Sequence, residues 1–174
     1  MYGVKIQTVA GDLTDHYDPR DKTLYLSPGV ANVASVASVA IAAHELGHAM
    51  QDAEDYLPLR FRSALVPVVN IGSNLGWILI MIGLFLRLTN LAWLGIIIFA
   101  GGALFALATL PVEFNASARA KQLLVQTGII QTDEEQRGVN AVLNAAALTY
   151  VAGLVTAILQ LLYYVSLVGG GRRR

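Results

Sequence analysis

The sequence of 174 residues contains no cysteine. Disulfide bonds, thiolate metal sites and a cysteine nucleophile are therefore excluded, and a transition-metal site would have to use His, Asp and Glu. Charged residues are also scarce, at 14% of the chain against roughly 25% in an ordinary soluble domain. The net charge is zero and no basic stripe is present, so nucleic acid is not expected as a partner. The composition, with 55% hydrophobic residues, is typical of a membrane protein.

Two apolar stretches, 64–86 and 91–112, follow one another with almost no charge. Each is longer than the about 20 residues that a helix needs to cross a bilayer, and Arg87 is the only charged residue from Ala64 to Val112. Because the segment RLTN between them has room only for a tight turn, we expect a transmembrane helical hairpin that returns the chain to the side it left. A third apolar stretch, from Ala141 to Gly171, predicts a C-terminal helix that spans the membrane or lies in its interface.

The polar segments predict the remaining elements. Runs with strand-like composition at 4–13 and 22–30, joined by the turn TDHYDPRD, indicate a β-hairpin. An Ala/Val-rich helix is expected from Ala31 to about Asp55. The expected class is a mainly α integral membrane protein with a small N-terminal β-hairpin. We divide it into a surface part (1–63), the transmembrane hairpin (64–112), a third part (113–140) and the C-terminal apolar helix (141–174). In the third part we expect a helix that begins at Glu113 and closes at Gly128. Thr132 and Glu135 then form a capping box at the start of the next helix.

The segment HELGH carries two of the three histidines of the chain. On a helix His44 and His48, four residues apart, lie on one face and can bind one metal ion. Glu45, next to a ligand, is placed to take a proton from metal-bound water, which makes it the candidate catalytic base. A helix that contains two histidines by coincidence is the alternative. The helical context beside a polar-to-membrane transition favours a Zn²⁺ site.

A catalytic zinc site normally has three protein ligands, and the candidates for the third are His16, Asp52, Asp55 and Glu113. Asp52 lies one turn beyond His48 on the same helix, and it fits less well as the third ligand than as a partner that orients a ligand imidazole. It could equally be a solvated acid at the helix end. Glu113 is the only acid between Asp55 and Asp133 and follows the second apolar stretch. Because the hairpin brings the chain back, Glu113 is expected beside the HELGH helix. The alternative is that Glu113 is not a ligand but an acid at a helix N-terminus, where the helix macrodipole favours negative charge.

Peptide hydrolysis also needs a group that stabilises the oxyanion. His16, Tyr17, Arg119 and Tyr150 are the candidates, and we take His16 and Tyr150 as candidate catalytic residues. An exposed turn histidine and a core tyrosine are the respective alternatives.

The quoted residues resemble a known family. HELGH, a membrane hairpin and PVEFNASARA are similar to the gluzincin layout of the HtpX and CAAX-prenyl-protease membrane metallopeptidases. The blocks LTDHYDPRDKTLYLSPGV, AAHELGHAMQDAEDYLPLRFRSALVPVVNIGSNLGW, LPVEFNASARA and VLNAAALTYVA resemble the YugP-like membrane zinc metallopeptidases over nearly the whole chain.

The resemblance implies a gluzincin-type metallopeptidase core with His44, His48 and Glu113 as zinc ligands and Glu45 as general base. It also implies an edge strand near His16 and Tyr17 that pairs with extended substrate. The sequence departs from the HtpX-type pattern at Ser117, where an aspartate is usual, so support for the ligands is expected from Asn115 or Asp52. It also lacks the further apolar segment with which YugP-like proteins generally begin, which suggests a shortened form.

The distribution of Lys and Arg predicts the orientation. The side that bears the polar N-terminal part would carry eight of them and the opposite side four. The eight are Lys5, Arg20, Lys22, Arg60, Arg62, Arg119, Lys121 and Arg137, and the four are Arg87, Arg172, Arg173 and Arg174. Because positive residues concentrate on the cytoplasmic side, we expect a multi-pass protein of the cell membrane whose active site faces the cytoplasm.

These observations predict a zinc-dependent membrane endopeptidase that cleaves membrane-associated or misfolded proteins. Its partners would be a polypeptide substrate and the lipid bilayer, and the sequence is compatible with a homo-oligomer. Two alternatives remain: an inactive zinc-binding membrane scaffold, or a metal transporter or sensor. The intact Glu45 argues against the first, and the lack of further metal ligands within the hairpin argues against the second.

Overall fold

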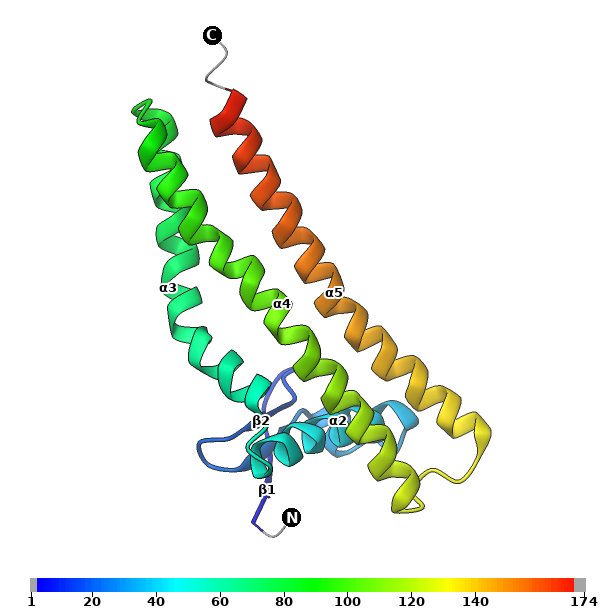
Figure 1. Cartoon of the computed structure of the whole chain (residues 1–174). Coiled ribbons are helices and arrows are strands. Elements are labelled where there is room, and N and C mark those ends of the chain that lie inside the picture. Colours follow the sequence, from blue (N-terminus) through cyan, green and yellow to red (C-terminus); the bar gives the residue numbers. More distant parts are fainter. Residues whose placement is uncertain (1–2, 171–174) are drawn as a thin grey trace. The chain divides into compact units, whose positions relative to one another are not determined.

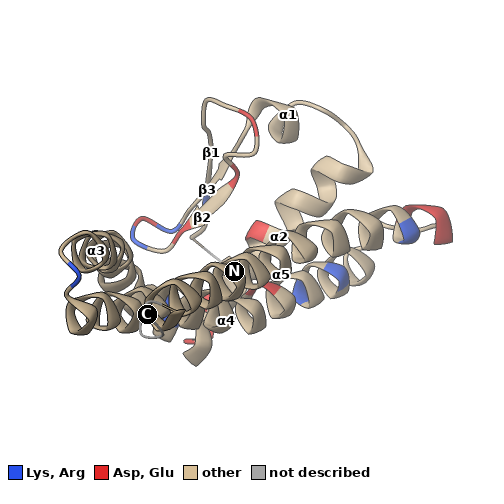
Figure 2. Ribbon diagram, turned by 90° about the horizontal axis from the view of Figure 1, so that it is seen from above, with Lys and Arg blue, Asp and Glu red and all other residues tan. Residues whose placement is uncertain are grey.

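The protein is mainly helical, with a small sheet at its N-terminal end. A computed structural model describes residues 3–170 (Figure 1), so Arg172, Arg173 and Arg174 lie outside the described residues. Among the described residues, three helices are long and apolar enough to cross a membrane, and Figure 2 shows that their apolar stretches carry few charged residues. The elements are β1 (Lys5–Thr8), β2 (His16–Asp18), β3 (Thr23–Leu26), α1 (Pro28–Ala31), α2 (Val36–Ala53), α3 (Leu57–Phe85), α4 (Thr89–Gln126) and α5 (Asp133–Gly170).

The sheet has three strands in the order β1-β3-β2. The predicted hairpin of the runs 4–13 and 22–30 is wrong, because β1 and β3 pair in parallel. The segment expected to be only a turn contains β2, which forms an antiparallel pair with β3. Strand β2 is held by α2, since the Tyr17 hydroxyl donates to Asp52 at 2.8 Å and the Tyr17 N–H donates to Glu45 at 3.0 Å.

The chain divides into two compact units. The first contains the described residues up to Leu59 together with Pro111–Thr149. In its core, small residues of α2 pack against α4 and the start of α5, and the sheet covers another part of α2. The buried side chains are Ala40, Ala43, Ala120, Leu124, Val139 and Leu143 in one cluster, and Leu24, Leu26 and Ala49 in the other.

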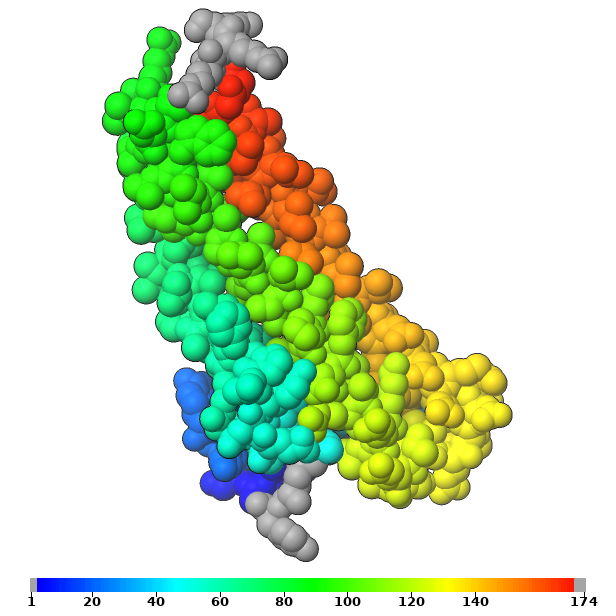
Figure 3. All heavy atoms as spheres, in the orientation of Figure 1, coloured from blue at the N-terminus to red at the C-terminus, as the bar shows by residue number. Residues whose placement is uncertain are grey.

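The second unit contains Arg60–Leu110 and the described residues from Tyr150 onward. Here α3 and α4 form the expected helical hairpin, with Arg87 in the left-handed conformation (φ 56°) at its turn. Glycines allow the two helices to touch: a Cβ at Gly95 would lie 2.6 Å from the backbone nitrogen of Ile80 and 2.7 Å from the Gly76 carbonyl oxygen. Near the turn both helices pack around the buried side chains of Ile80, Ala92 and Ile96, and Figure 3 shows the two green segments in contact there.

Helix α4 passes through Pro111 without ending. The expectation that a helix begins at Glu113 is therefore wrong. A proline inside a helix removes one backbone hydrogen bond, but on the C-terminal side of Pro111 the side chains of Val112, Ala116 and Ala120 are 0% exposed. Burial of this face favours continuation of the helix. Glu113 consequently has a fixed rotational position on α4 rather than lying at a frayed helix end.

The capping box predicted for the next helix is confirmed. The Glu135 N–H donates to the Thr132 hydroxyl at 3.2 Å, and the Glu135 carboxylate accepts from the Thr132 N–H at 3.0 Å. The preceding helix closes as expected, with Gly128 at φ +68°. The chain therefore turns sharply between α4 and α5.

Replacement of Gly95 by leucine should separate α3 from α4. Its side chain would meet backbone atoms of Ile80 and Gly76, which cannot move aside without shifting α3, and such overpacking costs about 1–3 kcal/mol. We expect a melting temperature in detergent lower by at least about 2 °C. Gly101→Leu in the same helix is the control, because nothing lies within 4 Å of its Cβ position. Equal losses in both variants would contradict the close packing.

Candidate metal centre

Helix α2 places the HELGH side chains at a buried position. Ser35 caps the helix, its hydroxyl accepting from the Ser38 N–H at 3.1 Å. One turn separates His44 from His48, and their rings lie edge to face with centroids 4.9 Å apart. His44 is 8% and Glu45 9% exposed, so the pair of imidazoles and the adjacent carboxylate are largely shielded from bulk water.

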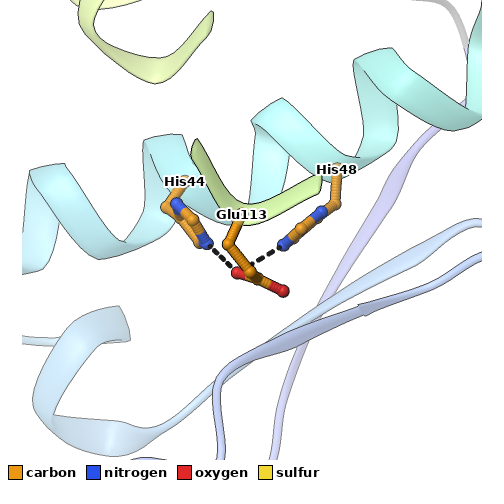
Figure 4. A group of neighbouring side chains, drawn as sticks. All are labelled: His44, His48 and Glu113. Atoms are coloured by element: carbon orange, nitrogen blue, oxygen red, sulfur yellow. Dashed lines mark hydrogen bonds and ion pairs between the residues drawn. The ribbon is translucent and has the colours of Figure 1, made fainter. Parts of the chain in front are cut away.

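Glu113 of α4 brings the third donor to these imidazoles. Its Oε2 atom lies 3.1 Å from Nε2 of His44 and 3.5 Å from Nε2 of His48, and Glu113 is 1% exposed. Figure 4 shows the carboxylate between the two rings, on the side to which both Nε2 atoms point. Three potential ligand atoms, one from each residue, lie within 4.8 Å of one another. The structure thus brings together residues that are 65 positions apart in the sequence.

The spacing of these atoms fits a tetrahedral zinc site. Ligand atoms at about 2.0–2.1 Å from a tetrahedral ion lie about 3.4 Å from one another. The two measured nitrogen–oxygen distances, 3.1 and 3.5 Å, lie on either side of that value. Two imidazoles and one carboxylate also form a donor set of the kind found in catalytic zinc sites, which leave a fourth position open.

A close contact between backbones sets the distance between α2 and α4. A Cβ atom at Gly47 would overlap the carbonyl oxygen of Ala116 and lie 3.0 Å from its carbonyl carbon. The element that approaches Gly47 is α4. Only glycine allows this approach, and it places Glu113, one turn before Ala116, over the imidazoles.

Uncharged groups hold the second nitrogen of each imidazole. Nδ1 of His44 lies 3.1 Å from the Ser117 hydroxyl, and Nδ1 of His48 lies 2.9 Å from Oε1 of Gln51. Such contacts orient metal-binding histidines. Ser117 therefore supports His44 itself, and the expectation that this support would have to come from Asn115 or Asp52 is wrong. The sequence reasoning missed Gln51, although its spacing of three residues after His48 on the same helix could have indicated it.

Asp52 does not orient an imidazole, and that expectation is wrong. Its carboxylate accepts the hydrogen bond from the Tyr17 hydroxyl. Tyr17 thereby joins β2 to α2, and its N–H holds Oε2 of Glu45 at 3.0 Å. The carboxylate of Glu45 is thus oriented by the backbone of β2, a strand that the resemblance implied but that composition alone did not indicate.

Burial and nearby charges alter the proton affinities of the site. Burial raises the pKa of Glu45, which suits a base that must exchange protons near neutral pH. For His48, burial lowers the pKa, but the hydrogen bond to Glu113 and the charges of Glu113 and Glu45 outweigh burial, so the pKa is raised. The carboxylates therefore favour positive charge at this position.

The other residues proposed from the sequence have the following surroundings. The exposed ring of His16 stacks on Tyr25 with centroids 4.9 Å apart, and its Nδ1 lies 2.7 Å from the Thr14 carbonyl. The Arg119 guanidinium forms an ion pair with Glu54 at 2.8 Å. Tyr150 lies half-buried on α5 within the second unit. Catalytic roles for His16 and Tyr150 stay predictions.

The fold and the site define a mainly helical protein whose described residues include three membrane-capable helices and a buried centre suited to zinc. The model of the family described as "Putative neutral zinc metallopeptidase" matches residues 1–169, and the chain belongs to this family. It is 46% identical over 172 residues to the "Putative membrane protease YugP" of Bacillus subtilis (strain 168), an alignment that covers 99% of this chain and 76% of that protein. The predicted family resemblance is confirmed. No solved structure matches the chain.

Replacement of Gly47 by alanine should weaken zinc binding. The added methyl group would push the Ala116 backbone away, and a displacement of α4 moves Glu113 from both imidazoles. We expect zinc affinity to fall about tenfold or more, measured by titration of metal-free protein. Gly29→Ala, with nothing within 4 Å of its Cβ position, should bind normally. Unchanged affinity in Gly47→Ala would show that the helix contact does not set the site.

Zinc affinity should also fall as the pH is lowered. Zinc needs the unprotonated Nε2 of His48, and the raised pKa of this imidazole means that protons begin to compete at a higher pH than for an ordinary histidine. Affinity is therefore retained above that raised pKa and lost below it, by about tenfold per pH unit for one proton. Calorimetric titrations at a series of pH values measure this slope. An affinity independent of pH would contradict it.

Proposed function

We propose that this protein is a zinc-dependent membrane endopeptidase that hydrolyses peptide bonds of membrane-associated or misfolded proteins. The observation that carries the proposal is the convergence of Glu113 on both imidazoles, with Glu45 on the same helix turn as His44. The family and the relative support zinc peptidase chemistry through their names. His44, His48 and Glu113 would hold the ion, in a gluzincin-type arrangement.

Each residue of the site has a distinct role in this mechanism. When bound, zinc lowers the pKa of a coordinated water and polarises the substrate carbonyl. Glu45 accepts the proton of the attacking water and later gives it to the departing amine, a general acid–base role for which its raised pKa is suited. The Tyr17 N–H keeps the Glu45 carboxylate in place before substrate arrives.

Strand β2 supports an extended peptide as substrate. It is an outer strand of the sheet, and the Tyr17 N–H is directed at Glu45 rather than at β3. The edge of β2 that does not pair with β3 therefore faces the Glu45 carboxylate. An extended segment of substrate that adds to this edge would align its backbone with the site. We place the polypeptide substrate there, and retain His16 at the start of β2 and Tyr150 as candidate oxyanion-stabilising groups.

The apolar helices support a location in the cell membrane. We infer that α3, α4 and α5 cross the bilayer, in line with their length and composition and with the name of the relative. The excess of Lys and Arg on the polar side supports a cytoplasmic active site. Membrane-associated polypeptides and the bilayer are then the partners, nucleic acid is not, and association into a homo-oligomer is compatible with the exposed apolar helices.

Two glutamate variants separate the catalytic base from the ligand. Glu45→Gln should keep bound zinc but lose hydrolysis by at least about 10²-fold, because the amide cannot accept the proton. Glu113→Gln should lose both zinc and hydrolysis. Metal analysis and cleavage of an unfolded membrane-associated polypeptide in detergent or vesicles, with and without chelator, measure the two properties. Glu134→Gln, in the exposed first turn of α5, is the matched control and should behave as the unchanged protein.

The outcomes discriminate between the functions considered. Full activity of Glu45→Gln would refute its role as base. A wild-type protein that holds zinc but cleaves no polypeptide would indicate the scaffold, and retention of zinc by Glu113→Gln would remove Glu113 from the ligand set.

A further inference from the structure

We propose that Gln51 is a positioning residue that fixes the tautomer of His48, so that the Nε2 lone pair of this imidazole points to the metal position before any ion binds. The inference rests on the proposed function only in taking that position as a metal site. Gln51 is 0% exposed, and every polar atom of its amide has a partner.

The partners determine which way the Gln51 amide faces. Its Nε2 lies 2.8 Å from the Val112 carbonyl oxygen, which can only accept. The same Nε2 lies 2.9 Å from Oδ1 of Asn115. A flipped amide would set its oxygen against the Val112 carbonyl oxygen, leaving two acceptors in contact. Both hydrogens of the Gln51 amide are therefore directed at α4.

The orientation of Asn115 is fixed in turn by Arg119. Nε of Arg119, which can only donate, lies 2.7 Å from Oδ1 of Asn115. The guanidinium also forms the ion pair with Glu54 and lies over the ring of Tyr56, 5.8 Å from its centroid. These contacts connect the C-terminal end of α2 to α4. Each amide along the connection can thus satisfy its partners in one orientation only.

The tautomer of His48 follows from the orientation of Gln51. Because both amide hydrogens point to α4, the oxygen Oε1 faces Nδ1 of His48 at 2.9 Å. An acceptor at this distance requires a hydrogen on Nδ1, so the neutral imidazole has its lone pair on Nε2. That lone pair faces Oε2 of Glu113 at 3.5 Å. Two acceptors held face to face favour a cation between them.

His44 provides an internal comparison. Its Nδ1 partner is the Ser117 hydroxyl at 3.1 Å, and a hydroxyl can either donate or accept. Ser117 therefore does not fix the tautomer of His44, and without a metal the Glu113 oxygen at 3.1 Å favours a hydrogen on its Nε2. Gln51, by contrast, favours a hydrogen on Nδ1 of His48. The two ligands on one helix differ in how strongly the protein prepares them.

The tautomers can be measured directly in metal-free protein. The whole chain, labelled with ¹⁵N at its three histidines and held in detergent at a pH where the imidazoles are neutral, gives one pair of ring nitrogen signals per histidine. Single His→Gln variants assign the signals. We expect His48 to carry its hydrogen on Nδ1, the opposite of the Nε2–H form that a free histidine side chain favours. A wild-type His48 with its hydrogen on Nε2 would overturn the inference without any substitution at Gln51.

Two substitutions at Gln51 test the cause. Gln51→Met has similar size but no acceptor, so His48 should change toward the Nε2–H form and zinc affinity should fall about 10–100-fold. Gln51→Glu still offers one oxygen to Nδ1, and its protonated carboxyl can donate to the Val112 carbonyl in place of the amide, so it should keep the tautomer. Ser117→Ala is the matched control, and should leave His48 unchanged. An unchanged His48 tautomer in Gln51→Met would refute the role, because loss of packing alone does not select a ring nitrogen.

The readout separates this inference from the proposed function. The tautomer is measured without zinc and without substrate. If His48 shows the expected form but the protein cleaves no polypeptide, the endopeptidase proposal fails and the role of Gln51 remains. If cleavage is found and His48 has the other tautomer, the role of Gln51 fails and the endopeptidase proposal remains.

Discussion

The contact between Gly47 and the backbone of Ala116 is the constraint on which the candidate centre depends. Helix α2 supplies the two imidazoles and the Glu45 carboxylate, and the two imidazoles alone do not make a three-ligand site. Helix α4 supplies the third donor, but its carboxylate reaches the imidazoles only because no side chain separates the two helices at this point. The buried alanines around it, Ala43 and Ala120, extend the same close packing. Because these residues are small, α2 and α4 lie close enough for the Glu113 carboxylate to reach both imidazole rings.

Around this contact the protein orients its reactive groups mainly through α4 and β2. Ser117 and Asn115 of α4 contact His44 and Gln51, while Tyr17 of β2 holds Glu45. His44 is therefore oriented by α4 and Glu45 by β2, whereas His48 contacts Gln51 of its own helix, which α4 holds in place. Such support from outside the helix is what makes the geometry of a site reproducible, since side chains on one helix are otherwise free to change rotamer.

Sequence reasoning found the parts of the site that depend on local pattern. The spacing of HELGH, the isolation of Glu113 among apolar residues and the capping box at Thr132 each follow from short-range rules. It failed where long-range pairing decides: β2 is a three-residue strand stabilised by Glu45 and Asp52 of α2, and no periodicity in so short a segment could indicate it. The continuity of α4 through Pro111 was also missed, because burial of the following turn outweighs the local preference. Gln51 was also missed because the direction of its amide depends on a long-range contact, the hydrogen bond that it donates to the Val112 carbonyl of α4.

The uncharged character of Ser117 and Gln51 has a consequence for the electrical balance of the centre. Both imidazoles are neutral when they bind a metal, so the formal charge of a divalent ion there is compensated by two carboxylates, Glu113 and Glu45. Had the supporting groups been acids, as at the position of Ser117 in related layouts, the buried assembly would carry an excess of negative charge at a considerable solvation cost. With Ser117 and Gln51 uncharged, a divalent ion held by His44, His48 and Glu113 would be balanced without surplus negative charge, which suits a buried site in a chain with so few charges.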